Sequence, residues 1–249
     1  WRWVEPDGLQ QGKHSLRIAS LILAAQVARD LYTLDPGNRF DPASSDRHFR
    51  LVSVDYFEMV MLPPLLAQVR KQAPGVVVEV ITATDAMSED LQKVRSDLAI
   101  DAFIPEDPRL NRMVLLEEEL VVVARAGHPC LRGHCSKEQF LSEEHVVLPD
   151  RNRRLPLDQI LDTPGWQRRT GARVTQFAGM LATVAGTDMI ATVPRRLALH
   201  YAHAMQLQVL AFPVPLPPVP IYLLWSPALD KDPAHRWLRE QLVSTAAVL

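Results

Sequence analysis

Four side chains that commonly bind metals crowd one short stretch of the sequence. In "GHPCLRGHC", residues 127 to 135, His128, Cys130, His134 and Cys135 fall within eight positions. Imidazole and thiolate groups are typical ligands of zinc, which raises the hypothesis of a zinc site. Structural zinc sites usually take their ligands from two well-separated pairs, whereas these four share one loop with glycine and proline. We therefore expect no metal here, and two reduced thiols in a cytoplasmic protein.

Catalytic motifs are the second place to look for chemistry. The sequence contains no phosphate-binding glycine loop, no nucleophile elbow and no HExxH pattern. It also lacks a convincing pair of cysteine and histidine, and the carboxylates near its predicted strand ends have no evident partner. We expect neither an enzyme nor a cofactor.

The bulk composition favours a globular protein without a strongly charged partner. The chain has 249 residues, of which 47% are hydrophobic and 22% charged, so it can bury one large core or two small ones. Its formal net charge of −2 lacks the basic excess of a stand-alone DNA-binding domain.

The apolar run near the start of the chain resembles both a signal peptide and a helix. Within residues 12 to 28 it follows a basic flank, as in a signal peptide, but it is too short to span a membrane. Leu23, Val27, Leu31 and Leu34 recur at the spacing of one helical face. We expect a helix and no membrane segment.

Strand and helix patterns alternate after residue 48. Within "FRLVSVDYFEMVMLPPLLAQVRKQAPGVVVEV", residues 49 to 80, a strand-like run leads to apolar positions at helical spacing and then to a second strand. That second strand is almost continuously apolar, which predicts burial on both faces in a parallel sheet. With another helix and the strand "SDLAI", residues 49 to 100 predict a βαβαβ unit.

Two adjacent prolines locate the start of the first helix in this unit. Pro63 and Pro64 are tolerated only in a first helical turn, so we expect the helix to begin near Met61. Residues 55 to 58 would then form the loop between strand and helix.

A second α/β unit follows a long apolar strand. Met113 to Ala124 form this strand, which three glutamates at positions 117 to 119 interrupt. Strand-like and helix-like segments then alternate again, with a capping-box pattern at Ser136 and Gln139. Past a stiff proline-rich connector, we expect Asp232 to cap a final helix.

Five stretches together resemble the effector-binding domain of LysR-type transcriptional regulators. They are the stretch of residues 49 to 80 quoted above, "SDLAI", "LVVVARAGHP", "TDMIATVPRRLA" and "LLWSPALDKDPAHRWLREQL", and the likeness covers residues 49 to 243. "DYFEM" and "DPAHRWLR" look like local motifs of the branch of this family that answers aromatic compounds.

The resemblance implies an α/β fold with two Rossmann-like sub-domains of the type 2 periplasmic-binding-protein kind. Two crossing strands would join the sub-domains, and a linker helix would precede them. The implied boundaries are 1–34 for the N-terminal segment and linker helix, 35–48 for a linker, 49–112 and 226–249 for regulatory sub-domain I, and 113–225 for sub-domain II with the crossing strands.

The resemblance also implies a mode of action. A cytoplasmic sensor would form a homo-dimer or tetramer and bind a small effector, such as an aromatic acid or a phenol, between its sub-domains. The family's winged helix-turn-helix would precede the linker helix, whereas only fourteen residues stand before residue 15 here. We therefore expect contact with DNA only through a part absent from these 249 residues. A secreted type 2 solute-binding protein of a transporter is the alternative.

The ends of the predicted strands supply candidate ligand contacts, because ligands of open α/β sheets bind at the carboxyl ends of strands. The candidates are Asp55, Tyr56, Phe57, Glu58, Thr82, Thr84 and Phe103 in the first unit, and Asp150, Arg151, Gln176, Phe177 and Thr192 in the second. In the resembling branch, the position of Gln176 often carries a histidine that contacts the effector. We expect Ala at position 57 or 176 to abolish binding and to leave the stability of the free chain little changed.

Each of these candidates has a purely structural alternative. Tyr56, Phe57 and Phe177 are equally explained as core aromatics, and Asp55 and Glu58 as caps of the helix that follows them. The arginines near position 151 fit a solvated charged face. An arginine that turned inward would bind the carboxylate of an aromatic acid through two parallel hydrogen bonds.

Overall fold

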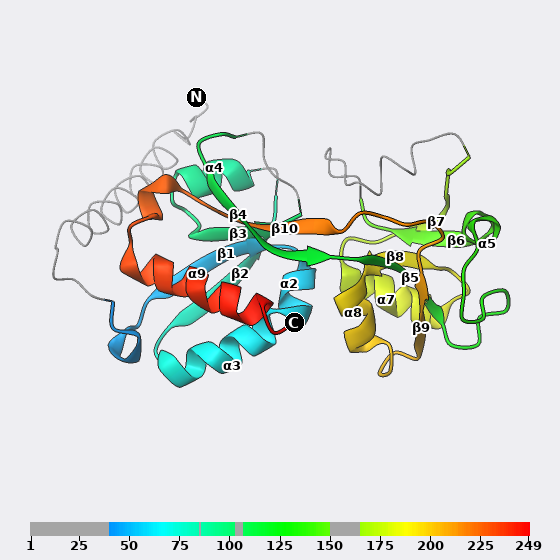
Figure 1. Cartoon of the computed structure of the whole chain (residues 1–249), viewed down its shortest axis with the longest axis horizontal. Helices are drawn as coiled ribbons and strands as arrows, with labels where there is room; N and C mark the ends of the chain where they lie inside the picture. The colour runs from blue at the N-terminus through cyan, green and yellow to red at the C-terminus, as the bar shows by residue number, and fades with distance from the viewer. Residues whose placement is uncertain (1–39, 85, 103–106, 150–164) are drawn as a thin grey trace, which may run out of the picture.

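The computed structural model of the chain describes residues 40–84, 86–102, 107–149 and 165–249. These residues form two α/β lobes that lie side by side along the longest axis of the molecule (Figure 1). The predicted pair of α/β units joined by two crossing segments is confirmed.

Lobe I is built around one mixed sheet. It comprises η1 (Pro42–Ser44), β1 (His48–Ser53), α2 (Asp55–Val60), α3 (Leu62–Gln72), β2 (Val77–Thr82), α4 (Met87–Gln92), β3 (Leu98–Asp101), β4 (Asn111–Glu118), β10 (Val219–Trp225), η2 (Pro227–Leu229) and α9 (Pro233–Ala246). The strand order is β2-β1-β3-β10-β4. Because β1 pairs in parallel with both β2 and β3, the predicted βαβαβ unit is confirmed.

Lobe II holds two smaller sheets. It comprises β5 (Leu120–Arg125), α5 (Lys137–Ser142), β6 (Glu144–Val147), β7 (Arg169–Arg173), α7 (Phe177–Gly186), β8 (Ala191–Pro194), α8 (Arg195–Tyr201) and β9 (Leu207–Ala211). Strands β8-β5-β9 form one sheet and β6-β7 the other. Ser136 and Gln139 form the predicted capping box at the start of α5.

Two segments of the chain cross between the lobes (Figure 1). On the outward crossing, β4 runs into β5 with Glu119 alone between them, so no loop separates the two sheets. On the return, residues 212 to 218 lead from β9 to β10 without forming a helix or strand. Strand β10 pairs along its whole length with β4 and therefore belongs to the sheet of lobe I.

The predicted loop of residues 55 to 58 is wrong, because these residues form helix α2. The backbone of Met61 stays in the right-handed helical region, so the chain passes from α2 into α3 with little interruption. Helix α3 begins at Leu62 with Pro63 and Pro64 in its first turn, close to the predicted start. The prolines cannot donate backbone hydrogen bonds to α2, which explains why one helix ends and another begins here.

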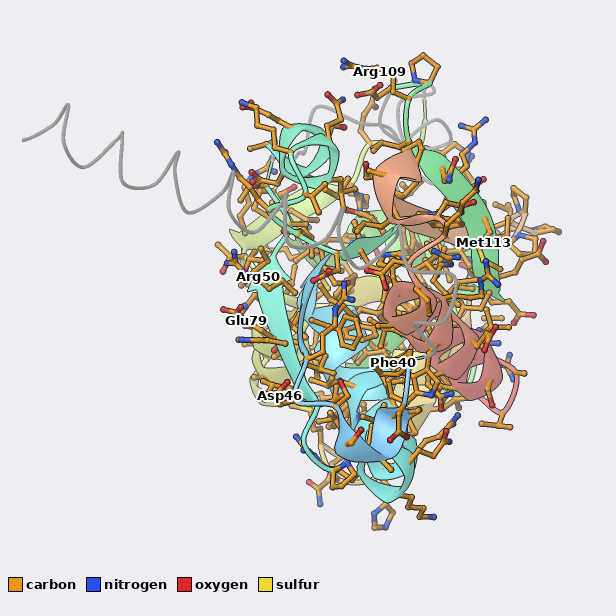
Figure 2. The ribbon with its side chains drawn as sticks, turned by 90° about the vertical axis from the view of Figure 1, so that its left-hand side faces the viewer. Phe40, Asp46, Arg50, Glu79, Arg109 and Met113 are labelled. Atoms are coloured by element: carbon orange, nitrogen blue, oxygen red, sulfur yellow. The ribbon has the colours of Figure 1, made fainter. Side chains whose placement is uncertain are left out.

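Strand β2 is half exposed, not buried on both faces as predicted, because it is an edge of the sheet. Val77 is 44% exposed. Arg50 on β1 stands opposite Glu79 on β2, with 2.8 Å between Nε and Oε2, and Figure 2 shows both at the surface of lobe I. Charged side chains of this kind discourage further strands from pairing at an edge.

The described part of the predicted linker is bound to lobe I. The ring of Phe40 lies 5.2 Å from that of Trp237 on α9, and Arg47 Nη1 lies 2.8 Å from Asp232 Oδ2. Asp232 is the predicted cap of α9 and accepts hydrogen bonds from the amides of Ala234 and His235. The chain therefore enters lobe I already attached to α9. The predicted linker helix of residues 15 to 34 lies outside the described residues.

The described residues form three hydrophobic cores, of which the smallest lies in lobe I around Leu91 and Leu224. The main core is shared by both lobes and includes Phe57 and Leu65 of lobe I and Val123 and Leu181 of lobe II. A second core lies on the other face of the β8-β5-β9 sheet, around Val122, Phe140, Ile190 and Leu210. No helix within the described residues is long and apolar enough to cross a bilayer.

Candidate functional site

The carboxyl ends of β1 and β2 lie next to each other, since Ser53 and Thr82 are paired in register. Thr82 and Thr84 are exposed, and Thr84 Oγ1 accepts a hydrogen bond from the amide of Ala86 at 3.3 Å. The hydroxyl of Ser53 is buried and donates to the carbonyl of Ile100 on β3 at 2.8 Å. The structure thus brings both predicted threonines to the strand end from which α2 starts.

The four candidate residues on α2 have different surroundings. Phe57 is fully buried and Tyr56 is 4% exposed, and both belong to the main core, which favours the packing alternative for these two. Glu58 is exposed. Asp55 is half-buried and reaches out of lobe I.

Asp55 caps a helix of the other lobe. Its Oδ2 accepts a hydrogen bond from the backbone N–H of Ala178, in the first turn of α7, at 2.9 Å. Gln176 holds the N-cap position of α7 with extended backbone, but its side chain makes no capping hydrogen bond. Glutamine is a poor cap compared with Asp, Asn or Ser. The sequence predicted a cap at Asp55, but for the helix that follows it and not for α7.

Gln176 and Phe177 lie at this same lobe junction. The side chain of Gln176 is exposed, and Phe177 is half-buried against the main core. The carboxyl end of β1 and the amino end of α7 therefore meet, with an amide and an aromatic ring beside them.

A buried carboxylate ties the lobes together at the outward crossing. Glu118, the last residue of β4, is 1% exposed. Its Oε2 accepts hydrogen bonds from the hydroxyl of Tyr56 at 2.5 Å and from Nη1 of Arg196 at 3.1 Å. Its Oε1 accepts from the backbone N–H of Arg196 at 3.3 Å, in the first turn of α8. One side chain thus joins α2, the crossing strand and α8.

The electrostatics of this cluster favour a fixed arrangement over reactivity. Burial, together with the neighbouring Glu118, raises the pKa of Tyr56 above its ordinary value of 10.0. Tyr56 therefore stays a neutral donor, and both oxygens of Glu118 are engaged as acceptors. This arrangement is suited to holding two lobes in place.

Of the remaining candidates, Thr192 lies within the described residues and does not face this junction. Thr192 on β8 pairs with Val122 on β5, and paired residues of antiparallel strands share a face. Because Val122 belongs to the second core, Thr192 lies on the face of the sheet away from α7. Phe103, Asp150 and Arg151 lie outside the described residues.

Three residues of this junction were not among the candidates predicted from the sequence: Glu118, Arg196 and Tyr201. The hydroxyl of Tyr201 lies 3.4 Å from the carbonyl of Met59, a further contact between α8 and α2. One signal was present, because three glutamates interrupt an apolar strand. A charge that interrupts such a strand needs a partner once it is buried.

The loop with the candidate zinc ligands has a structural explanation. His128 is 1% exposed; its Nε2 lies 2.8 Å from the carbonyl of Asp188, and its Nδ1 accepts from the amides of Cys130 and Leu131. Both cysteines are free thiols, and burial raises the pKa of Cys135 to about 11. Within the described part of the chain, no group of three or more such ligands is placed to hold a metal.

Comparisons with known sequences point in one direction. Residues 42–247 match the model of the protein family described as the LysR substrate binding domain. Nodulation protein D 1 of Rhizobium tropici is 33% identical over 215 residues, which is 84% of this chain and 69% of that protein. The HTH-type transcriptional activator NagR of Ralstonia sp is 28% identical, over 95% of this chain and 79% of that protein.

Solved structures share the same fold. A probable transcriptional regulator of Pseudomonas aeruginosa is 26% identical with a TM-score of 0.82, covering 97% of this chain and 80% of that one. The effector-binding domain of QuiR, solved in complex with shikimate, is 18% identical with a TM-score of 0.67. The match covers 82% of this chain and 99% of that one. The second likeness concerns the fold alone.

Proposed function

Because the chain belongs to the LysR family of transcriptional regulators, as an effector-binding domain with the type 2 periplasmic-binding-protein fold, we propose that it binds a small aromatic molecule between its two lobes. The domain senses a small ligand and is not an enzyme. Two of its relatives are named as HTH-type regulators of transcription, which supports a cytoplasmic sensor over a secreted solute-binding protein.

One observation carries the proposed site: the hydrogen bond between Asp55 and Ala178 brings the carboxyl end of β1 to the amino end of α7. Ligands of open α/β sheets bind at strand ends of this kind. Thr82, Thr84 and Gln176 would supply hydrogen bonds to a phenol or an acid.

An aromatic ligand is supported by the side chains available around that bond. Phe177 is half-buried and offers part of its ring for stacking, and planar rings stack well on aromatic side chains. Tyr56 and Phe57 would support the site from the core without touching the ligand. Contacts from Glu58, Phe103, Asp150, Arg151 and Thr192 remain predictions.

Aromatic acids and phenols are expected to raise the melting temperature of the chain without being chemically changed. A ligand at 100 times its dissociation constant adds about 2.7 kcal/mol to the free energy of unfolding by mass action. Benzoates, salicylates, nitroaromatics and flavonoids would be screened by thermal shift, and each active compound recovered and analysed.

The matched variants are Gln176→Ala, which should reduce the shift, and Lys71→Ala on the exposed side of α3, which should preserve it. If no aromatic compound shifts the melting temperature, the proposed ligand class is wrong. A chemically altered compound would contradict a sensing role.

The chain is also expected to form dimers or tetramers through the segment of residues 15 to 34, whose apolar positions share one helical face. Light scattering would compare the whole chain with a chain that starts at Phe40. We expect a larger mass for the whole chain and a loss of mass per particle after truncation. Monomers in both samples at tens of micromolar would refute the proposal.

A further inference from the structure

Helix α2 makes two hydrogen bonds to lobe II although it has only six residues, and a third to Glu118 at the end of β4. Asp55 bonds the amide of Ala178 on α7, and Tyr56 bonds Glu118 at the crossing. At its far end, the carbonyl of Met59 accepts from the hydroxyl of Tyr201 on α8. The relation between the lobes therefore depends on these bonds of α2 together with the main core that both lobes share.

These contacts differ in how firmly they are held. Glu118 is buried and its two oxygens accept three hydrogen bonds, so the side of the junction near the crossing is fixed. The bond between Asp55 and Ala178 is a single exposed hydrogen bond at the start of α2. Breaking it exposes no buried charge and therefore costs much less than breaking the Glu118 cluster.

The bond also replaces a cap that α7 lacks. The first N–H groups of a helix need acceptors from outside the helix, and in most helices the N-cap side chain supplies one. The Gln176 side chain accepts no hydrogen bond there, and no residue of the first turn of α7 is acidic. Lobe I therefore supplies the acceptor for a helix of lobe II, so the start of α7 is stabilised only while the lobes stay together.

We propose that Asp55 is a latch, whose hydrogen bond to the amino end of α7 holds the two lobes in the arrangement of Figure 1 before any ligand is bound. The Glu118 cluster acts as the pivot, and the lobes separate on the Asp55 side when the latch opens. This inference goes beyond the proposed function and does not depend on the chemistry of the effector, because the latch acts in the free protein.

The test removes the bond from each side separately. Asp55→Ala removes the acceptor, and Ala178→Pro removes the donor while Asp55 remains. Proline is tolerated in a first helical turn, as at Pro63 and Pro64 of α3, and Ala178 is exposed. Asp55→Asn keeps an acceptor oxygen and should keep the lobes together. Glu58→Gln removes a neighbouring charge from the same helix and serves as the matched control.

The separation of the lobes would be measured by pulsed electron paramagnetic resonance on the ligand-free chain. One spin label is attached to the exposed Cys130 of lobe II and the other to Lys71→Cys on α3 of lobe I. Loss of a hydrogen bond to a charged group is expected to increase the population with a longer distance about tenfold in Asp55→Ala. Ala178→Pro and the double variant should show the same increase, because all three remove one bond.

Amide exchange provides an independent readout of the same bond. In Asp55→Ala, exchange at Ala178 should be about tenfold faster, since the N–H loses its acceptor. In Asp55→Asn it should stay close to that of the unmodified chain. An unchanged distance distribution in Asp55→Ala, or an increase in Asp55→Ala that Ala178→Pro fails to reproduce, would overturn the latch. Should Ala178→Pro not fold, the contrast between Asp55→Ala and Asp55→Asn decides in the same way.

Discussion

Replacing Phe57 with Ala is expected to lower the free energy of unfolding by about 3–5 kcal/mol, the usual cost of removing a fully buried phenylalanine. Phe57 is 0% exposed and lies in the main core that both lobes share. This loss of stability has two parts: the transfer free energy of the buried ring, and the cost of the cavity that remains. The expectation from sequence, that this change would leave the stability of the free chain little altered, is therefore withdrawn.

Urea unfolding followed by circular dichroism would measure the effect as a lower midpoint with an unchanged slope. Phe57→Leu should cost much less, because most of the buried volume is kept. Phe177→Ala is the second comparison, since that ring is half-buried and should cost less than Phe57→Ala. Equal and small losses in Phe57→Ala and Phe177→Ala would mean that Phe57 is not a core residue.

Replacing Glu118 with Ala is expected to lower the free energy of unfolding by about 3 kcal/mol, at the lower end for breaking a buried ion pair. The lower end applies because the side chain of Arg196 is 31% exposed, so water can partly replace its lost partner. The buried hydroxyl of Tyr56 and the amide of Arg196 also lose their acceptor.

A series of variants separates the bonds of Glu118. Tyr56→Phe should cost about 1 kcal/mol, because Glu118 keeps Arg196 while one hydrogen bond is lost. In the double variant the two losses should not add, because Tyr56→Phe has no bond left to remove once Glu118 is gone. Urea midpoints for the two single variants and the double variant give the coupling free energy between Tyr56 and Glu118. Fully additive losses would contradict a direct bond between Tyr56 and Glu118.

Local features of this fold could be predicted from sequence alone. The capping box of Ser136 and Gln139, the cap at Asp232 and the helix start near Met61 each depend on residues within a few positions of one another. Hydrophobic periodicity likewise depends on neighbours along the chain, which is why the two α/β units were found. The candidate threonines at the carboxyl end of β2 follow from the same local patterns.

Tertiary structure decided the contacts that define the lobe junction. Asp55 and Ala178 are 123 positions apart, Tyr56 and Glu118 are 62, and Glu118 and Arg196 are 78. A capping side chain has the same chemistry at any helix, so its type does not identify the helix that it caps. That choice depends on how the lobes pack.

Tertiary structure also decided which side chains are buried. The apolar sequence of β2 fits a central strand, but the order of strands in the sheet places it at the edge. Thr192 follows a strand pattern, but its pairing with Val122 turns it to the second core. The sequence by itself thus determined most of the elements and the caps formed within them, such as Ser136 and Asp232, since these rest on near neighbours. The packing of distant elements decided which side chains face the junction, because pairing and burial arise only when those elements meet.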